Sequence, residues 1–95
     1  MKYIEAKIKI KLKKKTFLMG SIIDKTVFVR VPSEWNKNKI ERFIIEAGYS
    51  LAERLPIRKS KIQKIVVLSQ NELRYRPRNV KCYEWDFDDN CGEWE

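Results

Sequence analysis

Hydrophobic and polar residues follow two different periods along this chain. Residues 3–13 alternate strictly, because the even positions carry isoleucine, alanine or leucine and most odd positions carry lysine. This period of two predicts a half-buried β-strand. Residues 33–55 instead repeat apolar side chains at three- and four-residue steps, which places them on one face of an α-helix. The members of that face are Ile40, Phe43, Ile44, Ala47, Leu51 and Leu55.

This segment is the only long helix that the sequence predicts. Ser33 is the expected N-cap, because its hydroxyl can accept a hydrogen bond from an amide of the first turn. Pro56 should end the helix. We expect the apolar helix face to pack against the apolar faces of the strands, at Ile8, Ile10 and Val29 among others.

Two further strands are predicted before the helix. Residues 16–23 form an extended segment that Gly20 interrupts, which indicates a bulge. Residues 26–31 are rich in valine and form the next strand. Asp24-Lys25 lies between the two apolar runs, as a tight hairpin turn would.

The region after the helix predicts two or three more strands. Residues 62–68 are nearly continuous apolar and β-branched, the pattern of a central strand. Residues 69–72 predict a polar turn. Residues 73–78 alternate again and should form an edge strand, since Pro77 has no amide hydrogen to donate. Residues 80–87 are the last predicted strand.

This order predicts an α+β fold with elements βββαβββ: an antiparallel, meander-like sheet of about five strands with one long helix packed on one face. The 95 residues, 43% of them apolar, suffice for one small domain. We expect that domain to span residues 1–87, and residues 88–95 to form an acidic, flexible tail. No apolar run approaches the roughly 18 residues of a membrane span. The sequence lacks a signal-peptide pattern, so we expect a cytoplasmic protein with no membrane partner.

Charge is distributed unevenly along the chain. Residues 1–31 carry nine Lys and Arg against two acids, and residues 56–81 carry eight against one. Residues 32–55 are balanced, and residues 82–95 carry six acids and no base. Two basic flanks around a neutral helix suggest a polyanionic partner, such as DNA or RNA.

Several kinds of catalytic site are excluded by composition. The chain has no histidine, which removes Ser-His and Cys-His pairs and histidine-bound metals. Two cysteines cannot complete a four-ligand zinc site, and the calcium-loop spacing that begins at Asp86 lacks its closing glutamate. We therefore expect no enzyme activity, no cofactor and no metal. Cys82 and Cys91 could form a disulfide or remain two free thiols.

Two rows of basic residues are the candidate binding site. Alternate residues of a strand lie about 6.6 Å apart on one face, similar to the phosphate spacing of an extended nucleic-acid strand. The aromatic rings of Tyr3 and Phe28 share faces with this charge and could stack on bases. The alternative is that the rows are solvated surfaces that protect sheet edges. The candidate residues are Lys7, Lys9, Lys11 and Lys13, then Arg74, Arg76 and Arg78, and finally Arg30, Arg58, Lys59 and Lys61.

Residues 27–35, VFVRVPSEW, and the later Gly48-Tyr49-Ser50 carry a resemblance to a known family. Strand, proline, helix and then a Gly-Tyr-Ser turn resemble a ribbon-helix-helix DNA-binding protein. The resemblance implies a second full helix after residue 50 and a DNA-binding regulator. This chain departs from that pattern, because LAERLP reaches Pro56 after five residues.

The sequence thus predicts a small, basic, non-catalytic nucleic-acid-binding protein that contacts the phosphate backbone. The alternative is a protein-binding module or inhibitor of the kind that viruses and other mobile elements encode. In that case the acidic tail, with Trp85 and Trp94, would dock on a host protein. The sequence is also compatible with a homodimer.

Overall fold

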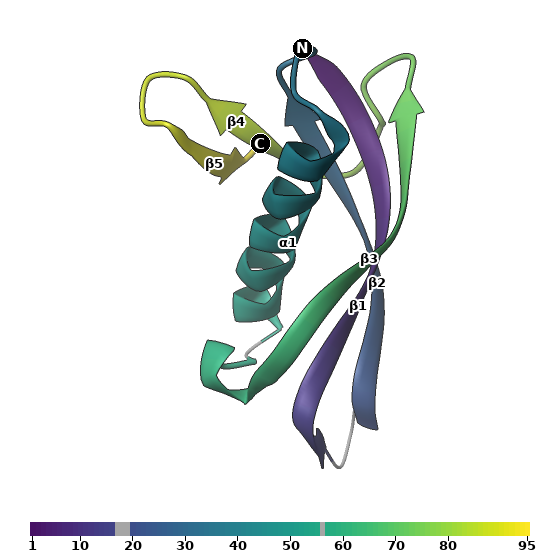
Figure 1. Cartoon of the computed structure of the whole chain (residues 1–95), viewed down its shortest axis with the longest axis vertical. Helices are drawn as coiled ribbons and strands as arrows, with labels where there is room; N and C mark the ends of the chain where they lie inside the picture. Colours follow the sequence, from purple (N-terminus) through teal and green to yellow (C-terminus); the bar gives the residue numbers. More distant parts are fainter. Residues whose placement is uncertain (17–19, 56) are drawn as a thin grey trace.

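A computed structural model describes residues 1–16, 20–55 and 57–95 of the chain. Within these residues the chain forms a five-stranded sheet and one α-helix, which confirms the predicted α+β class. The helix covers one face of the sheet, and the other face is open (Figure 1). The elements are β1 (Lys2–Thr16), β2 (Gly20–Val31), α1 (Lys37–Arg54), the 3₁₀ turn η1 (Lys59–Lys61), β3 (Ile62–Leu73), β4 (Cys82–Asp86) and β5 (Cys91–Trp94).

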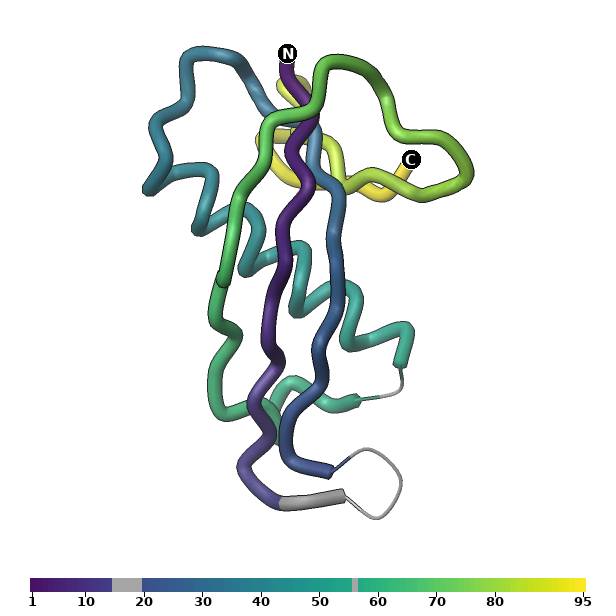
Figure 2. The backbone as a smooth tube through the Cα atoms, turned by 90° about the vertical axis from the view of Figure 1, so that its right-hand side faces the viewer, coloured from purple at the N-terminus to yellow at the C-terminus, as the bar shows by residue number. Residues whose placement is uncertain are grey.

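The strand order is β3-β1-β2-β4-β5, so the sheet is mixed and not the expected antiparallel meander. β1 pairs antiparallel with both β2 and β3, and β4 pairs antiparallel with β5. β2 and β4 are parallel. The reason is the connection 74–81, which leaves the edge strand β3 and crosses the upper ends of β1 and β2 before entering β4 (Figure 2). The element order is accordingly ββαβββ.

The core lies between α1 and the even-numbered face of β1, as the two periods predicted. All five apolar residues of that strand face are buried, and so are most residues of the predicted helix face. Gly48 allows the helix to approach closely, because a Cβ there would lie 3.0 Å from Ile65 Cδ1. The buried residues of this layer include Ile4, Ala6, Ile8, Ile10, Leu12, Val29, Ile40, Phe43, Ile44 and Ala47.

The helix begins three residues later than predicted, because its N-cap is Asn36 instead of Ser33. The Asn36 Oδ1 accepts a 2.8 Å hydrogen bond from the Lys39 amide. Ser33 lies in a turn that the Trp35 amide closes by donating to the Pro32 carbonyl. The helix ends at Arg54, and the predicted terminator, residue 56, lies outside the described residues.

The predicted hairpin at Asp24-Lys25 is wrong, because β2 is one continuous strand. Asp24 and Lys25 pair with Lys9 and Ile8 of β1. A 15-residue β1 offers pairing partners along the whole of β2, so two polar residues do not interrupt the ladder. β1 ends at Thr16 and β2 begins at Gly20, and residues 17–19 lie outside the described residues.

β3 extends through the predicted turn at 69–72, where it pairs with the first half of β1. The predicted edge strand at 73–78 does not form, since β3 ends at Leu73. β3 is itself an edge strand, and its pairing with β1 shifts register twice. An edge strand is exposed to solvent along one side, and polar or charged side chains are common there. The polar second half of β3 is therefore compatible with its position at the edge.

Cys91–Trp94 form β5, where the sequence predicted a free acidic tail. The Trp94 Nε1 donates to Ser50 Oγ at 2.7 Å, which joins β5 to the helix. Gly92 packs so closely that an added Cβ would collide with the Tyr83 ring and lie 2.8 Å from Phe43 Cε1. These contacts hold the β4–β5 hairpin on the aromatic end of the core.

The ribbon-helix-helix interpretation is wrong. After α1 the described chain continues as η1 and β3, without a second α-helix. A five-stranded sheet provides the core that the second helix would otherwise complete. Among the described residues, no helix has both the length and the apolar character needed to cross a bilayer.

Candidate nucleic-acid interface

The open face of the sheet is the face that α1 leaves uncovered (Figure 2). The odd-numbered residues of β1 lie on it, because their even-numbered neighbours face the core. Four of them, Lys7, Lys9, Lys11 and Lys13, form the lysine row along the strand. The structure thus keeps this predicted row together, on the second strand of the sheet counted from the β3 edge.

The pairing register gives each lysine of the row its neighbours. Lys7 lies between Ser69 and Thr26, and Lys9 lies between Val66 and Asp24. Lys11 lies between Lys64 and Ile22. Within the described part of the chain, no lysine of the row forms an ion pair.

The pair of Lys11 and Lys64 has an energetic cost. Like charges directly opposite each other on neighbouring strands destabilise a sheet by a few tenths to about 1 kcal/mol. A bound anion would neutralise this repulsion. Lys64 was not among the predicted residues, because it lies within the apolar run 62–68 and only the register places it beside the row.

A shallow hollow of about 360 Å³ adjoins Lys7, lined also by Asp24, Thr26 and Leu68. The Ser69 hydroxyl, beside Lys7 in the register, is buried and has no hydrogen-bond partner among the described residues. The Thr26 hydroxyl and the Lys7 ammonium group are exposed donors that can bind a phosphate oxygen, whereas the Ser69 hydroxyl is covered.

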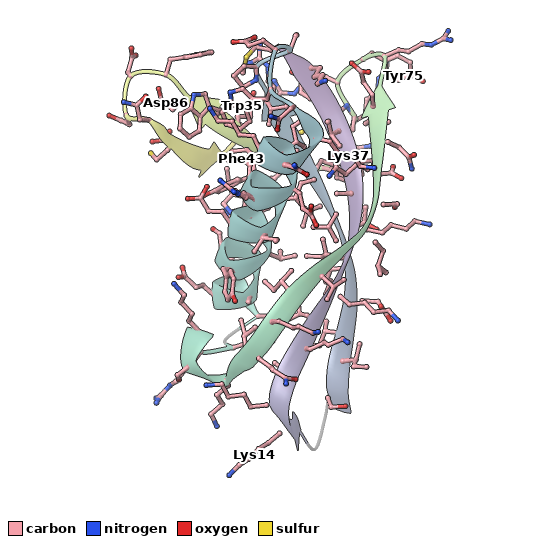
Figure 3. The ribbon with its side chains drawn as sticks, in the orientation of Figure 1. Lys14, Trp35, Lys37, Phe43, Tyr75 and Asp86 are labelled. Carbon is pink, nitrogen blue, oxygen red and sulfur yellow. The ribbon has the colours of Figure 1, made fainter. Side chains whose placement is uncertain are left out.

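The basic loop after the helix lies at the same end of the molecule as the last residues of β1. Arg58, Lys59 and Lys61 are all exposed there, in and beside η1. Pairing of Leu12 with Ile62 brings η1 next to the end of β1. Figure 3 labels Lys14 at this lower end of the molecule, far from Tyr75. The lysine row and the loop therefore form one basic end.

Arg30 lies away from this basic end, and its guanidinium is already paired with an acidic side chain. Its Nη1 donates to Glu84 Oε1 at 2.9 Å, and its guanidinium lies 5.6 Å from the centre of the Tyr3 ring. The hydrogen bond to Glu84 raises the pKa of Arg30 above its ordinary value. Arg76 Nη2 approaches the other oxygen of Glu84 at 3.7 Å. Both arginines are thus less available to phosphate than the sequence predicted.

Arg74, Arg76 and Arg78 do not form a row on a strand, because all three lie in the connection 74–81. Arg74 and Arg78 are exposed and form no ion pair in the described part of the chain. Between them stands Tyr75, which is 78% exposed. The sequence interpretation placed this ring on the opposite face of a strand and did not count it as a binding residue.

The two aromatic candidates of the sequence are less accessible. Tyr3 and Phe28 are both half-buried, and Arg30 covers the Tyr3 ring. Phe28 lies between Glu5 and Cys82 in the register, so its direct cross-strand neighbour on β1 is an acid and not a lysine of the row. Stacking of a base on either ring is therefore disfavoured.

The β4–β5 hairpin presents acids on the side opposite its aromatic contacts. Glu84 and Glu93 are direct cross-strand partners. A groove of about 660 Å³ is lined by Glu84, Asp86, Asp88, Glu93 and Glu95 together with Arg30 and Arg76. Its acids exceed its arginines, so it repels phosphate and limits a nucleic-acid path to the rest of the open face.

Trp85 and Trp94, which the alternative interpretation assigned to protein docking, pack in an aromatic cluster. Its other members are Trp35, Phe43 and Tyr83. The Trp35 and Trp85 rings are 5.0 Å apart, and so are those of Tyr83 and Trp94. The exposed aromatic residue of this hairpin is Phe87, at 61%. The sequence analysis placed Phe87 at the end of the last predicted strand and did not count it as a binding residue.

The two cysteines are free thiols at opposite ends of the hairpin. The Cys82 amide and carbonyl pair with Glu95, whereas Cys91 pairs with Asp86. A disulfide would require the hairpin to open. Burial raises the pKa of the Cys82 thiol, and desolvation followed by the Asp89 carboxylate raises that of Cys91.

One group of side chains has ligand atoms close enough for a metal ion, namely Asp89, Cys91 and Glu93 within the described residues. The two acids are exposed on the β4–β5 hairpin, where acidic side chains are usually hydrated.

No family model, no curated protein and no solved structure matches this chain.

Proposed function

We propose that this chain is a small, non-catalytic nucleic-acid-binding protein of the cytoplasm, which holds a phosphate backbone along β1. The observation that carries the proposal is the lysine row on the open face, with Lys64 directly opposite Lys11. The repulsion between these two lysines costs folding stability, and among the described residues no lysine of the row forms an ion pair that would offset the cost. A polyanion lying along the row offsets that cost.

The dimensions of the row fit several consecutive phosphates. Lys7 and Lys13 are six residues apart, which corresponds to about 20 Å along a strand. Lys64 widens the charged strip toward β3, and the exposed Thr26 hydroxyl supplies a neutral donor beside Lys7. Contacts of this type position a backbone without reading its sequence.

The acidic residues of the open face limit where a bound nucleic-acid backbone can lie. Asp24 lies beside Lys9, but the larger acidic group is on the β4–β5 hairpin. A backbone bound at the basic end would run along β1 and β3 and avoid that hairpin. Binding should therefore be dominated by charge and strongly dependent on salt.

Fluorescence anisotropy with labelled oligonucleotides tests the proposal. The wild-type chain should bind at low ionic strength and lose about 100-fold in affinity between about 50 and 200 mM salt, if about five phosphates of a single strand are contacted. The triple variant Lys9→Gln, Lys11→Gln, Lys13→Gln should bind much more weakly while remaining folded. Absence of wild-type binding at low salt would contradict the proposal.

The same substitutions give a second signal in the free protein. Lys11→Gln removes the repulsion with Lys64, so it should raise the free energy of unfolding by a few tenths to about 1 kcal/mol. Urea denaturation measures this change. If a lysine of the row instead stabilises the folded protein, its substitution should lower the free energy of unfolding.

A further inference from the structure

The connection 74–81 displays an aromatic ring with no packing partner among the described residues. Tyr75 is 78% exposed, the largest exposed fraction among the large hydrophobic side chains of the described chain. Every tryptophan, by contrast, packs in the aromatic cluster. A tyrosine ring with this exposure contributes little buried area to the core. The ring is therefore available to a ligand.

Three features restrict the conformation of the segment around Tyr75. Arg76 is held toward Glu84, and the following Pro77 restricts its own φ angle. Asn79 has a φ of 61°, a left-handed conformation that turns the chain toward β4. A segment fixed in this way loses less conformational entropy on binding than a free loop. Figure 3 shows Tyr75 at the upper end of the molecule, beside the end of β3.

The charges around this ring favour an anionic ligand. Arg74 and Arg78 are exposed, and neither is paired with an acid in the described part of the chain. An aromatic ring between unpaired arginines combines a stacking surface with phosphate contacts, which is the combination that single-stranded nucleic acids need. Bases in a duplex are stacked on each other and cannot lie flat on such a ring.

We propose that Tyr75 stacks on an unpaired base, and that the preferred ligand of this chain is consequently single-stranded nucleic acid. This inference rests on the proposed function. The backbone would follow the lysine row along β1 and continue to the connection 74–81. Ser69 is beside Lys7 in the register, and Tyr75 follows Ser69 by six residues, a reach of at most about 20 Å.

The test compares affinities for a single-stranded oligothymidylate and a duplex of equal length, at one salt concentration. Tyr75→Ala should weaken binding of the single strand by about 5-fold to 100-fold, the usual contribution of one stacked base. Tyr75→Phe keeps the ring and should bind like the wild type. The matched control is Phe87→Ala, which removes the second most exposed aromatic ring of the described residues, on the acidic hairpin, and should leave the affinity unchanged.

Two results would overturn the inference without touching the proposed function. One is a Tyr75→Ala variant that binds the single strand as tightly as the wild type. The other is a wild-type chain that prefers the duplex. In both cases the lysine-row triple variant would still lose affinity, so the two proposals fail separately. If Tyr75→Ala and Phe87→Ala weaken binding equally, the effect comes from loss of an exposed ring and not from stacking, and the inference is also wrong.

Discussion

Arg30 Nη1 donates to Glu84 Oε1 at 2.9 Å across the parallel pair of β2 and β4. Glu84 is only 8% exposed, and its second oxygen faces Arg76 at 3.7 Å. One buried carboxylate thus links the sheet, the connection 74–81 and the β4–β5 hairpin. A buried charge is stable only with such partners.

Glu84→Gln should lower the free energy of unfolding by about 1–2 kcal/mol, because the charge-assisted bond to Arg30 weakens and Arg76 loses its partner. Urea denaturation measures the change. Glu93→Gln is the matched control, since Glu93 lies directly opposite Glu84, is exposed and has no ion pair in the described chain. Because this substitution removes the repulsion between two opposed carboxylates, it should leave stability unchanged or raise it by up to about 1 kcal/mol. Equal losses in the two variants would contradict the role given to Glu84.

Gly92→Ala should destabilise the protein by about 2–3 kcal/mol, because the new Cβ collides with the Tyr83 ring and the hairpin must move. Gly48→Ala is the comparison. There the close atoms are the ends of the Ile65 and Ile8 side chains, and alanine gains about 1 kcal/mol of helix propensity over glycine. The two effects should nearly cancel. A Gly92→Ala variant as stable as the wild type would show that the hairpin is not packed on the core.

Burial raises the pKa of Tyr83 from 10.0 to about 12. Below pH 10 the folded and unfolded chains both keep the phenol proton. Between pH 10 and about 12 only the unfolded chain loses it, so stability should fall as the pH rises through this window. The fall attributable to Tyr83 is about 1–2 kcal/mol.

Tyr83→Phe separates this effect from the titration of lysines. The variant has no phenol at this position, so its stability should fall less than that of the wild type over the same pH range. Chemical denaturation at several pH values gives the comparison. Parallel curves for the two proteins would mean that the Tyr83 hydroxyl is as hydrated in the folded chain as in the unfolded one.

Thiol labelling should distinguish the two cysteines. Cys82 is fully buried, whereas Cys91 is partly exposed, although desolvation and nearby acids raise its pKa. We expect Cys91 to react slowly in the native protein and Cys82 only after denaturation. Mass spectrometry counts the labels. A protein that takes up no label without reductant, even when denatured, would contain the disulfide that the hairpin register excludes.

The sequence predicted those elements whose pattern is local. The alternation at 3–13 and the helical spacing at 40–55 each identify an element and its buried face. Pairing between distant strands leaves no such pattern. The register that joins Asp24 to Lys9, and the one that joins Lys64 to Lys11, depends on where the whole strands lie. This is why the hairpin was misplaced and Lys64 was missed.

Charge patterns were misleading at the C-terminus. Four acids and no base in residues 88–95 predicted a solvated tail, but Trp94 falls on the same face of the β4–β5 hairpin as Tyr83 and Trp85. Their burial against Phe43 outweighs the hydration of the acids on the other face. The alternation of aromatic and acidic residues in this region is visible in the sequence. The sequence does not show which strand pairs with it.

The most direct test of the account is the salt dependence of binding in two charge-matched double variants. One is Lys9→Gln with Lys11→Gln on the open face. The other is Lys37→Gln with Arg42→Gln, two exposed helix residues without an ion pair in the described chain. Both variants lose two positive charges.

The logarithm of the binding constant for a single-stranded oligonucleotide, plotted against the logarithm of the salt concentration, gives a slope for each protein. We predict that the open-face variant has a slope shallower than the wild type by about 1.4, because two phosphate contacts are lost at about 0.7 each. The helix variant should keep the wild-type slope. Equal changes in the two variants would mean that net charge alone drives binding, and would contradict a phosphate path along β1.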